Sequence, residues 1–184
     1  MKLHKMDILA EEKFEYFHNR VCVIHDNANC KYSGYPYRLH LDAVVNVGRQ
    51  YLYLIEDNDR EWFDVLCALS AHDLIEDCAV SWNDLKKMSS ERSADIVYNV
   101  SNELGRNRKE RTTKTYPKIA SCRLATFVKL CDRIANMKFS YFCNDEKGMF
   151  SLYKKEHPEF YKALYNEDHG FDDMWKELQA LGLH

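Results

Sequence analysis

The amino-acid sequence predicts an all-α protein. Only 6 glycines and 3 prolines occur among its 184 residues, so few positions would interrupt a helix. Apolar residues recur three or four positions apart over most of the chain, whereas the period-two alternation of half-buried strands is scarce. Hydrophobic residues make up 46% of the chain, enough for one sizeable core. We therefore expect one helical domain covering residues 1–184.

Five segments are expected in the N-terminal half. A helix covers about residues 8–25 and leads into a turn-rich stretch, 26–37, which contains Asn, Ser, Gly and Pro. An amphipathic helix follows, opening at His40 and running to about residue 55. Residues 56–60 form an acidic connector, and the next helix continues from Trp62 to Asp77.

The C-terminal half is expected to hold further helices. Ser81 and Asp84 are typical of a capped helix N-terminus. The polar, basic stretch from 107 to 117 ends in a proline, so we interpret it as a mobile loop. The remaining apolar patterns predict helices at about residues 90–104, 119–142, 149–165 and 171–181.

Composition excludes several classes of protein. The net charge of −3 argues against a nucleic-acid partner bound through a large basic face. No segment reaches transmembrane length, and the N-terminus carries charges where a signal peptide needs an apolar run. The cysteines number seven and none forms C-x-x-C, which indicates reduced thiols. We expect a cytoplasmic protein with no membrane partner.

The helix from Trp62 to Asp77 places charges where its own pattern predicts a core. Trp62, Val65 and Leu69 mark an apolar stripe, and the stripe continues through His72, Asp73 and Glu76. Carboxylates on a buried face are costly unless a cation or hydrogen-bond donors neutralise them. A metal ion is the simplest such cation.

Two further residues complete a candidate set of metal ligands. His40 opens the preceding amphipathic helix, and Asp132 interrupts the apolar line of the 119–142 helix. Two imidazoles and two carboxylates suit manganese, iron or zinc better than calcium, which prefers oxygen ligands. Glu76 and Asp77 each follow a ligand at i+4, so both would extend toward a water on that ion.

Three motifs resemble those of the HD-domain phosphohydrolases, and in particular the hydrolase branch of the RelA/SpoT alarmone enzymes and the small alarmone hydrolases. Gly34-Tyr35-Pro36-Tyr37-Arg38-Leu39-His40 is similar to G-x-P-Y-x-x-H, and His72-Asp73-Leu74-Ile75-Glu76-Asp77 is similar to H-D-x-x-E-D. Residues 128–137 are similar to V-K-L-A-D-R-x-x-N-M. The motifs span about residues 20–140, in the family's order. The HD pair alone is unspecific, but its combination with K-L-x-D-R-x-x-N is specific.

The resemblance implies an HD-domain helical bundle with a metal site between its helices. It implies a manganese ion held by His40, His72, Asp73 and Asp132, with Glu76 and Asp77 orienting or deprotonating the attacking water. Asn136 would contact the nucleotide sugar. The implied reaction removes the 3′-pyrophosphate from (p)ppGpp and gives GDP or GTP and pyrophosphate.

A highly charged substrate also needs cations. Lys31, Lys129 and Arg133 lie in or beside the motifs and are candidates to bind phosphate. The basic segment between residues 106 and 114 could close over the phosphates. Tyr153 or Lys154 of the aromatic C-terminal segment could line the nucleotide pocket, although packing is the simpler interpretation of that segment.

The chain departs from the family pattern at several positions. The family usually has an arginine-lysine pair shortly before G-x-P-Y, whereas this chain reads Asn29-Cys30-Lys31-Tyr32. Leu41 replaces a proline, Cys78 replaces the threonine after E-D, and Ala135 stands where histidine or tyrosine is common. These changes affect the expected recognition of the base rather than the metal ligands or acids.

Other functions remain open on the sequence alone. An HD-type hydrolase could act on a deoxynucleotide monophosphate, a nicotinamide dinucleotide phosphate or an adenosine alarmone. A domain of this fold could also sense a nucleotide without hydrolysing it, although a sensor has no need of Glu76 and Asp77. As simpler alternatives, Glu76 and Asp77 could be surface acids, although their place beside the ligand pair favours catalysis. Lys129 and Arg133 could pair with neighbouring acids, and Asn136 could bond a backbone group.

Overall fold

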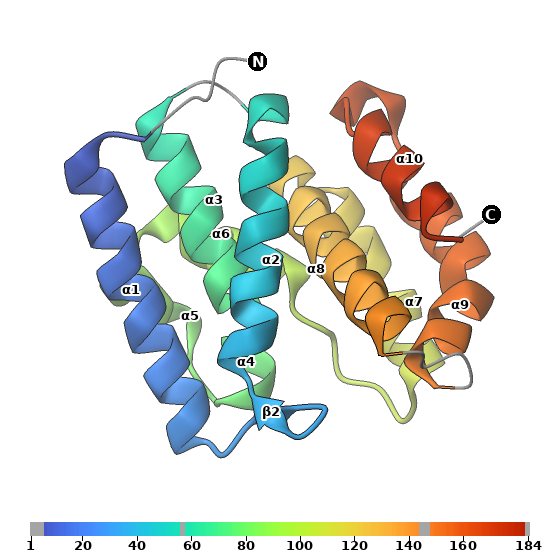
Figure 1. The fold of residues 1–184 in the computed structure, drawn as a ribbon, viewed down its shortest axis with the longest axis horizontal. Helices are drawn as coiled ribbons and strands as arrows, with labels where there is room; N and C mark the ends of the chain where they lie inside the picture. The colour runs from blue at the N-terminus through green and yellow to red at the C-terminus, as the bar shows by residue number, and fades with distance from the viewer. Residues whose placement is uncertain (1–5, 56–57, 144–147, 183–184) are drawn as a thin grey trace.

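The computed structural model describes residues 6–55, 58–143 and 148–182, and the described chain is almost entirely helical (Figure 1). Its N-terminal helices are α1 (Ile8–Asn27), α2 (Arg38–Tyr51), α3 (Asp59–Ala71), α4 (Leu74–Asp77), α5 (Trp82–Met88) and α6 (Glu91–Val100). The later ones are α7 (Arg108–Ala120), α8 (Arg123–Phe142), α9 (Met149–Leu164) and α10 (Asp172–Ala180), with short 3-10 turns η1 (Leu52–Leu54) and η2 (Glu167–His169). The all-α prediction is confirmed.

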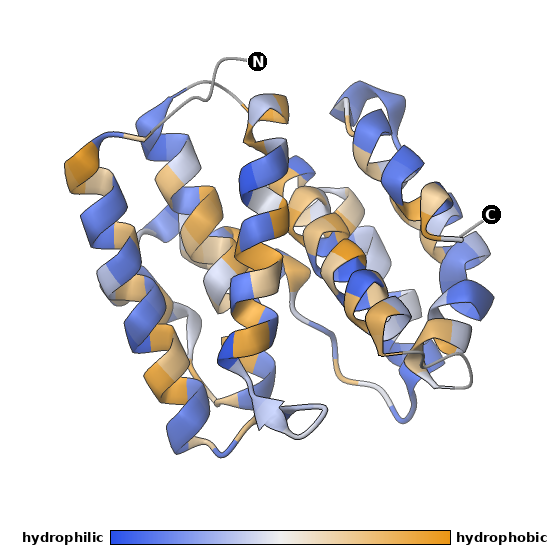
Figure 2. Ribbon diagram, in the orientation of Figure 1, coloured by the Kyte–Doolittle hydropathy of each residue, from blue (hydrophilic) through white to orange (hydrophobic). Residues whose placement is uncertain are grey.

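Helix α8 lies at the centre of the bundle. It packs against α2, α3 and α6 on one side and against α7, α9 and α10 on the other. Figure 2 shows hydrophobic segments along α2, α3 and α8, whereas the outer helices α1 and α10 carry more hydrophilic ones. The two-sided packing explains why α8 is apolar over most of its circumference.

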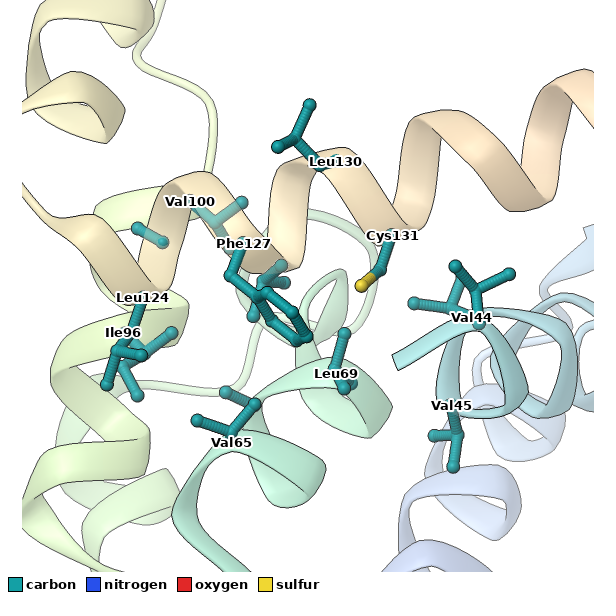
Figure 3. Packing of buried hydrophobic residues seen from close by; sticks show 14 of the residues in the cluster. Val44, Val45, Val65, Leu69, Ile96, Val100, Leu124, Phe127, Leu130 and Cys131 are labelled. Atoms are coloured by element: carbon teal, nitrogen blue, oxygen red, sulfur yellow. The ribbon is translucent and has the colours of Figure 1, made fainter. Parts of the chain in front are cut away.

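Buried side chains from α2, α3, α6 and α8 form the core beside the site. Phe127 of α8 is fully buried and lies between Val65 and Leu69 of α3 and the apolar residues of α6 (Figure 3). Cys131, one turn later on α8, lies toward Val44 of α2. This layer of apolar contacts holds in place the three helices that carry the candidate ligands.

The segment between α1 and α2 forms a small hairpin rather than an irregular turn. Strand β1 (Lys31–Tyr32) pairs antiparallel with β2 (Tyr35–Pro36), with Tyr32 opposite Tyr35. Ser33 and Gly34 turn the chain with positive φ angles of 49° and 86°. Glycine adopts this conformation without a steric penalty, which explains its position at the tip.

The prediction of a mobile loop at residues 107–117 is wrong, because these residues belong largely to α7. The Asn107 side chain accepts a hydrogen bond from the Glu110 backbone and caps the helix start. Glu110 also pairs with Arg106 and Lys114, which are spaced at i±4. Pro117 is accommodated within the helix near its end, so the proline did not mark a loop.

Several other helix boundaries in the structure differ from the predicted ones. The expected helix at 90–104 ends at Val100, where the Ser101 hydroxyl donates to the Val97 carbonyl. The expected helix at 119–142 is divided, with Ile119 in α7 and α8 starting at Arg123. Ser81 and Asp84 form the predicted capping box. Within the predicted connector, Glu56 and Asp57 lie outside the described residues, and Asp59 already belongs to α3.

None of the described helices has both the length and the apolar character needed to cross a membrane.

Candidate metal centre and flanking pockets

His40 lies in the first turn of α2 and is buried, with an exposed fraction of 3%. Its ring stacks on Tyr32 of the hairpin, with 4.7 Å between ring centroids. Tyr37, just before α2, contacts its other side edge-on at 5.4 Å. The hairpin therefore fixes the orientation of the imidazole and directs Nε2 inward.

His72 and Asp73 lie at a break between two helices, where the sequence pattern predicted a continuous one. Helix α3 ends at Ala71, and Asp73 has φ −101° and ψ −1° before α4 begins. This is the bridge region of the backbone, which active-site residues often occupy. On a regular helix adjacent side chains diverge, but the break brings His72 Nε2 and Asp73 Oδ2 within 2.9 Å.

Three of the four predicted ligands converge on one point, and the fourth lies beside them. The Nε2 atoms of His40 and His72 are 3.2 Å apart, and Asp73 Oδ2 lies 3.7 Å from His40 Nε2. Asp132 Oδ1 of α8 lies 3.5 Å from His40 Nε2 and 3.9 Å from His72 Nε2. Ligands about 2.1 Å from a shared ion are roughly 3–4 Å from one another. His40, His72 and Asp73 thus form a cluster that fits a divalent metal ion, with Asp132 beside it.

The second ring nitrogen of His72 is held by the backbone. Nδ1 lies 2.9 Å from the Leu69 carbonyl oxygen, which has no proton, so Nδ1–H is the donor. This bond fixes the tautomer and leaves the Nε2 lone pair facing the cluster, as in most metal-bound histidines.

Charges at the cluster are adapted to a cation. Burial alone would raise the pKa of Asp73, but the charges and hydrogen bonds of His72, His40 and Tyr37 together outweigh burial and lower this pKa. Burial would likewise raise the pKa of Asp132, and Lys129 lowers it. Burial lowers and Asp73 raises the pKa of His72, which reaches about 9. Without an ion, a proton on His72 balances the two carboxylates, and a divalent ion would take that proton's place.

Two tyrosines that the sequence analysis left without a role complete the surroundings of the ligands. The Tyr37 hydroxyl donates to Asp73 Oδ2. The Tyr32 hydroxyl donates to Asn136 Oδ1 at 2.7 Å, and Asn136 Nδ2 donates to Asp132 Oδ1. Both tyrosines lie in or beside the G-x-P-Y motif, and this position in the sequence could have identified them as site residues.

The predicted catalytic acids lie at the end of α4, on the rim of the cluster. Glu76 is exposed and accepts hydrogen bonds from the backbone and side-chain nitrogens of Asn102, at 2.8 and 2.6 Å. Asp77 is also exposed as a residue, but its carboxyl group is partly shielded from solvent. This desolvation, then the negative charges of Asp73 and Glu76, raise the pKa of Asp77.

An aromatic pocket of about 480 Å³ opens on one side of the cluster. Asn136 lines it, and so does Tyr153, one of the two α9 residues expected near a nucleotide. The remaining lining residues are mostly aromatic or small: Tyr32, Ser33, Tyr35, Phe139, Ser140, Cys143 and Met149. Its composition suits a flat, partly polar ligand.

A second, smaller pocket of about 70 Å³ is lined by four cations, Arg108, Arg111, Lys129 and Arg133. Arg133 is buried between the rings of Tyr153 and Phe160, each 4.4 Å from its guanidinium carbon. Its Nη1 has no hydrogen-bond partner among the described residues. Glu156 pairs with Arg108 and lies 3.6 Å from Arg133, so it offsets part of the charge.

Several predicted cations lie elsewhere. Lys31 is exposed on the hairpin and lines neither of these pockets. Arg106 and Lys114 pair with Glu110 on the exposed side of α7. Lys129 forms an ion pair with Asp132 at 2.9 Å, which agrees with the alternative that this lysine pairs with a neighbouring acid. It also lines the cationic pocket.

Helix α8 orders these features along one face. Lys129 lines the cationic pocket, Asp132 faces the histidines and Asn136 lines the aromatic pocket. Their spacing of three and four residues keeps them on the same side of a helix. The cluster is therefore flanked by a positively charged pocket and an aromatic one.

Comparisons with known proteins define the fold. No family model matches the sequence, and no curated protein matches it. A solved structure does match, from work reporting that a metazoan ortholog of SpoT hydrolyzes ppGpp and plays a role in starvation responses. The TM-score is 0.59 at 20% identity, and the alignment covers 94% of this chain and 97% of that chain. The chain thus has the all-α HD-domain fold that its motifs predicted.

Proposed function

We propose that this protein is a metal-dependent phosphohydrolase that removes the 3′-pyrophosphate from (p)ppGpp. The observation that carries the proposal is the order of the site along α8, where the ligand cluster lies between a cationic and an aromatic pocket. A guanosine tetraphosphate presents the same order of groups: base and sugar, the 3′-phosphate that water attacks, and the distal phosphate of the same pyrophosphate. The fold shared with a protein whose reported activity is ppGpp hydrolysis supports this substrate.

In this proposal His40, His72, Asp73 and Asp132 hold a divalent ion, preferably manganese. Such an ion, when bound, lowers the pKa of its water and neutralises charge on phosphoryl oxygens. The mixed nitrogen and oxygen donors suit manganese, iron or zinc. The Tyr37 hydroxyl and the Leu69 carbonyl hold Asp73 and His72 in orientation, so the ligands are positioned before any ion arrives.

Glu76 and Asp77 are assigned to the attacking water. The raised pKa of Asp77 brings it closer to the working pH, which favours proton transfer. Glu76 is oriented by Asn102, which also lines the cationic pocket. This hydrogen bond supports the assignment of Glu76 to the side of the cluster where a phosphate would enter.

The two pockets are assigned to the ends of the substrate. The base and ribose occupy the aromatic pocket, with Asn136 facing the sugar and Tyr153 along the base. The distal phosphate of the 3′-pyrophosphate faces Arg133 Nη1 and Lys129 in the cationic pocket, and the ribose 3′-oxygen is the group that leaves the attacked phosphorus. Guanidinium and ammonium groups form charge-assisted hydrogen bonds with phosphate oxygens.

The test is a manganese-supplemented hydrolysis assay with ppGpp, pppGpp and the adenosine alarmone, followed by product identification. We expect pyrophosphate release that stops on chelation. Asp73→Ala should lose the metal, and Glu76→Ala should retain it while the rate falls by about 10²–10⁴. Glu159→Ala, on the exposed side of α9, is the matched control and should be unaffected.

Hydrolysis of a deoxynucleotide monophosphate or a nicotinamide dinucleotide phosphate instead would reassign the substrate. Metal binding with no turnover of any nucleotide would indicate a nucleotide sensor and refute the catalytic proposal.

A further inference from the structure

A second group of metal-binding side chains lies beside α4, apart from the His/Asp cluster. His25 comes from the last turn of α1, Cys30 directly precedes the hairpin, and Cys78 directly follows α4. Cys78 Sγ lies 3.3 Å from His25 Nδ1 and 4.0 Å from Cys30 Sγ. The three ligand atoms all lie within 4.8 Å of one another.

These distances match the edges of a tetrahedral zinc shell. With Zn–S near 2.3 Å and Zn–N near 2.05 Å, a tetrahedron has edges of about 3.8 Å between two sulfurs and about 3.6 Å between sulfur and nitrogen. The observed separations of 4.0 and 3.3 Å differ from these by only about 0.2–0.3 Å. Small side-chain rotations would place one ion at equal distance from all three atoms.

The imidazole is in the form that binds a metal. His25 is completely buried and its ring stacks on Tyr37 at 4.5 Å. Burial lowers its pKa to about 4, so the ring is neutral near pH 7 and one nitrogen carries a lone pair. Its Nδ1 lies 3.3 Å from Cys78 Sγ, so this nitrogen would be the ligand.

The two thiols are poorly suited to form a disulfide spontaneously. Burial, and then the neighbouring Cys30, raise the pKa of Cys78 to about 12. The thiolate is the nucleophile in disulfide formation, so this thiol would react slowly. A divalent ion would stabilise the negatively charged thiolate and would therefore displace the proton of the thiol.

The positions of the two cysteines give an independent argument. Cys30 lies where the family pattern has its arginine-lysine pair, and Cys78 replaces the threonine after E-D. The chain departs from the pattern at two sites that are 48 residues apart, and both departures place a sulfur next to His25.

We propose that His25, Cys30 and Cys78 form a second metal site that binds zinc or another thiophilic divalent ion. Cys30 and Cys78 are only partly buried, so solvent can complete the shell. A bound ion would join the end of α1, the start of the hairpin and the end of α4, directly after Asp77. The site would be structural, holding the hairpin and the acid-bearing turn together, and it stands whether or not the proposed hydrolysis is confirmed.

Cobalt titration tests this site separately from the His/Asp cluster. In an Asp73→Ala background, which weakens the other site, we expect one equivalent of Co²⁺ to produce a thiolate-to-cobalt charge-transfer band. Zinc should displace it. Cys78→Ser and Cys30→Ser should each abolish or strongly weaken the band, whereas Cys143→Ser, at an exposed cysteine, should leave it unchanged.

The unaltered protein provides a measurement that needs no variant. Metal analysis after zinc loading and desalting should show zinc retained alongside manganese at the His/Asp cluster, and the zinc should protect Cys30 and Cys78 from alkylation. Absence of the cobalt band in folded protein, or its survival in both serine variants, would overturn the proposal. So would a Cys30–Cys78 disulfide found under conditions where zinc is present.

Discussion

Tyr37 links the hairpin to the acidic side of the His/Asp cluster. Its hydroxyl donates to Asp73 Oδ2, and its ring stacks on His25 and contacts the edge of His40. This one side chain therefore packs against a proposed ligand of each metal site, His25 and His40, and orients a further proposed ligand, Asp73. Because the hydroxyl and the ring act separately, phenylalanine at this position removes only the hydrogen bond.

We expect Tyr37→Phe to weaken manganese binding at the His/Asp cluster by about 10–100-fold, the usual cost of losing a partner of a metal ligand. Stability should change little because the ring contacts remain. Calorimetric titration with Mn²⁺ measures the affinity, and Tyr16→Phe, on the exposed face of α1, is the control. An unchanged affinity would show that Asp73 does not depend on this donor.

The candidate ligands could be predicted because charge on an apolar stripe is conspicuous in a sequence. His72, Asp73 and Asp132 interrupt patterns that otherwise predict a core, and the structure places them together with His40. Tyr32 and Tyr37 give no such signal, since tyrosine is common in both cores and turns. Lys31 was placed by proximity along the chain, but the direction of a hairpin side chain depends on strand register.

At the level of secondary-structure elements, the ends of the helices determine which side chains meet at the site. The break between α3 and α4 lets adjacent side chains point at one ion, and the cap at Asn107 makes a helix of a basic segment. The stripe of α3 continues in register through the break, and the basic segment has no strong apolar period, so periodicity alone missed both features. Close approach of α2 to α3 matters as much, because these helices carry His40 and His72.

Gly48 allows that approach. A Cβ at this position would lie 2.2 Å from Leu69 Cδ1, and Leu69 is fully buried. Helix propensity alone would make Gly48→Ala stabilising by up to about 1 kcal/mol. The overlap must instead displace the buried Leu69 side chain within a full core or separate α2 from α3, so we expect a net loss of about 1–3 kcal/mol in the free energy of unfolding.

Urea denaturation measures this loss, with Asn46→Ala at an exposed position of α2 as the control. A stabilised Gly48→Ala protein would mean that Leu69 can move aside. A shift of His40 away from His72 should also reduce metal affinity in the alanine variant, in parallel with the stability.

At the scale of the whole molecule, the site is assembled from segments far apart in the chain. The hairpin, α8 and α9 line the aromatic pocket, and α7 and α8 line the cationic one. The motifs between residues 20 and 140 could predict the candidate ligands and the fold. Helix α9 contributes Tyr153, one of two residues that the sequence analysis proposed there, and Glu156, which it did not propose because its position depends on tertiary packing.

Buried histidines should make the stability of the metal-free protein depend on pH in both directions. Burial lowers the pKa of His25 from 6.5 to about 4, so between these values the unfolded chain binds more protons than the folded one. Stability from this group is therefore present above about pH 6.5 and is lost as the pH falls toward 4. The shift corresponds to about 3 kcal/mol at most. The lowered pKa of His40 acts with the same sign.

His72 has the opposite sign and a different window. Its pKa is raised to about 9, chiefly by Asp73 against the effect of burial, so its contribution is complete below about 6.5 and is lost as the pH rises through 9. We therefore expect chelated protein to be most stable near pH 6.5 in urea denaturation series. His25→Gln should flatten the acidic side alone, because glutamine does not titrate. An acidic limb that is equally steep in this variant would exclude His25 as its source and leave His40 and the carboxylates to account for it.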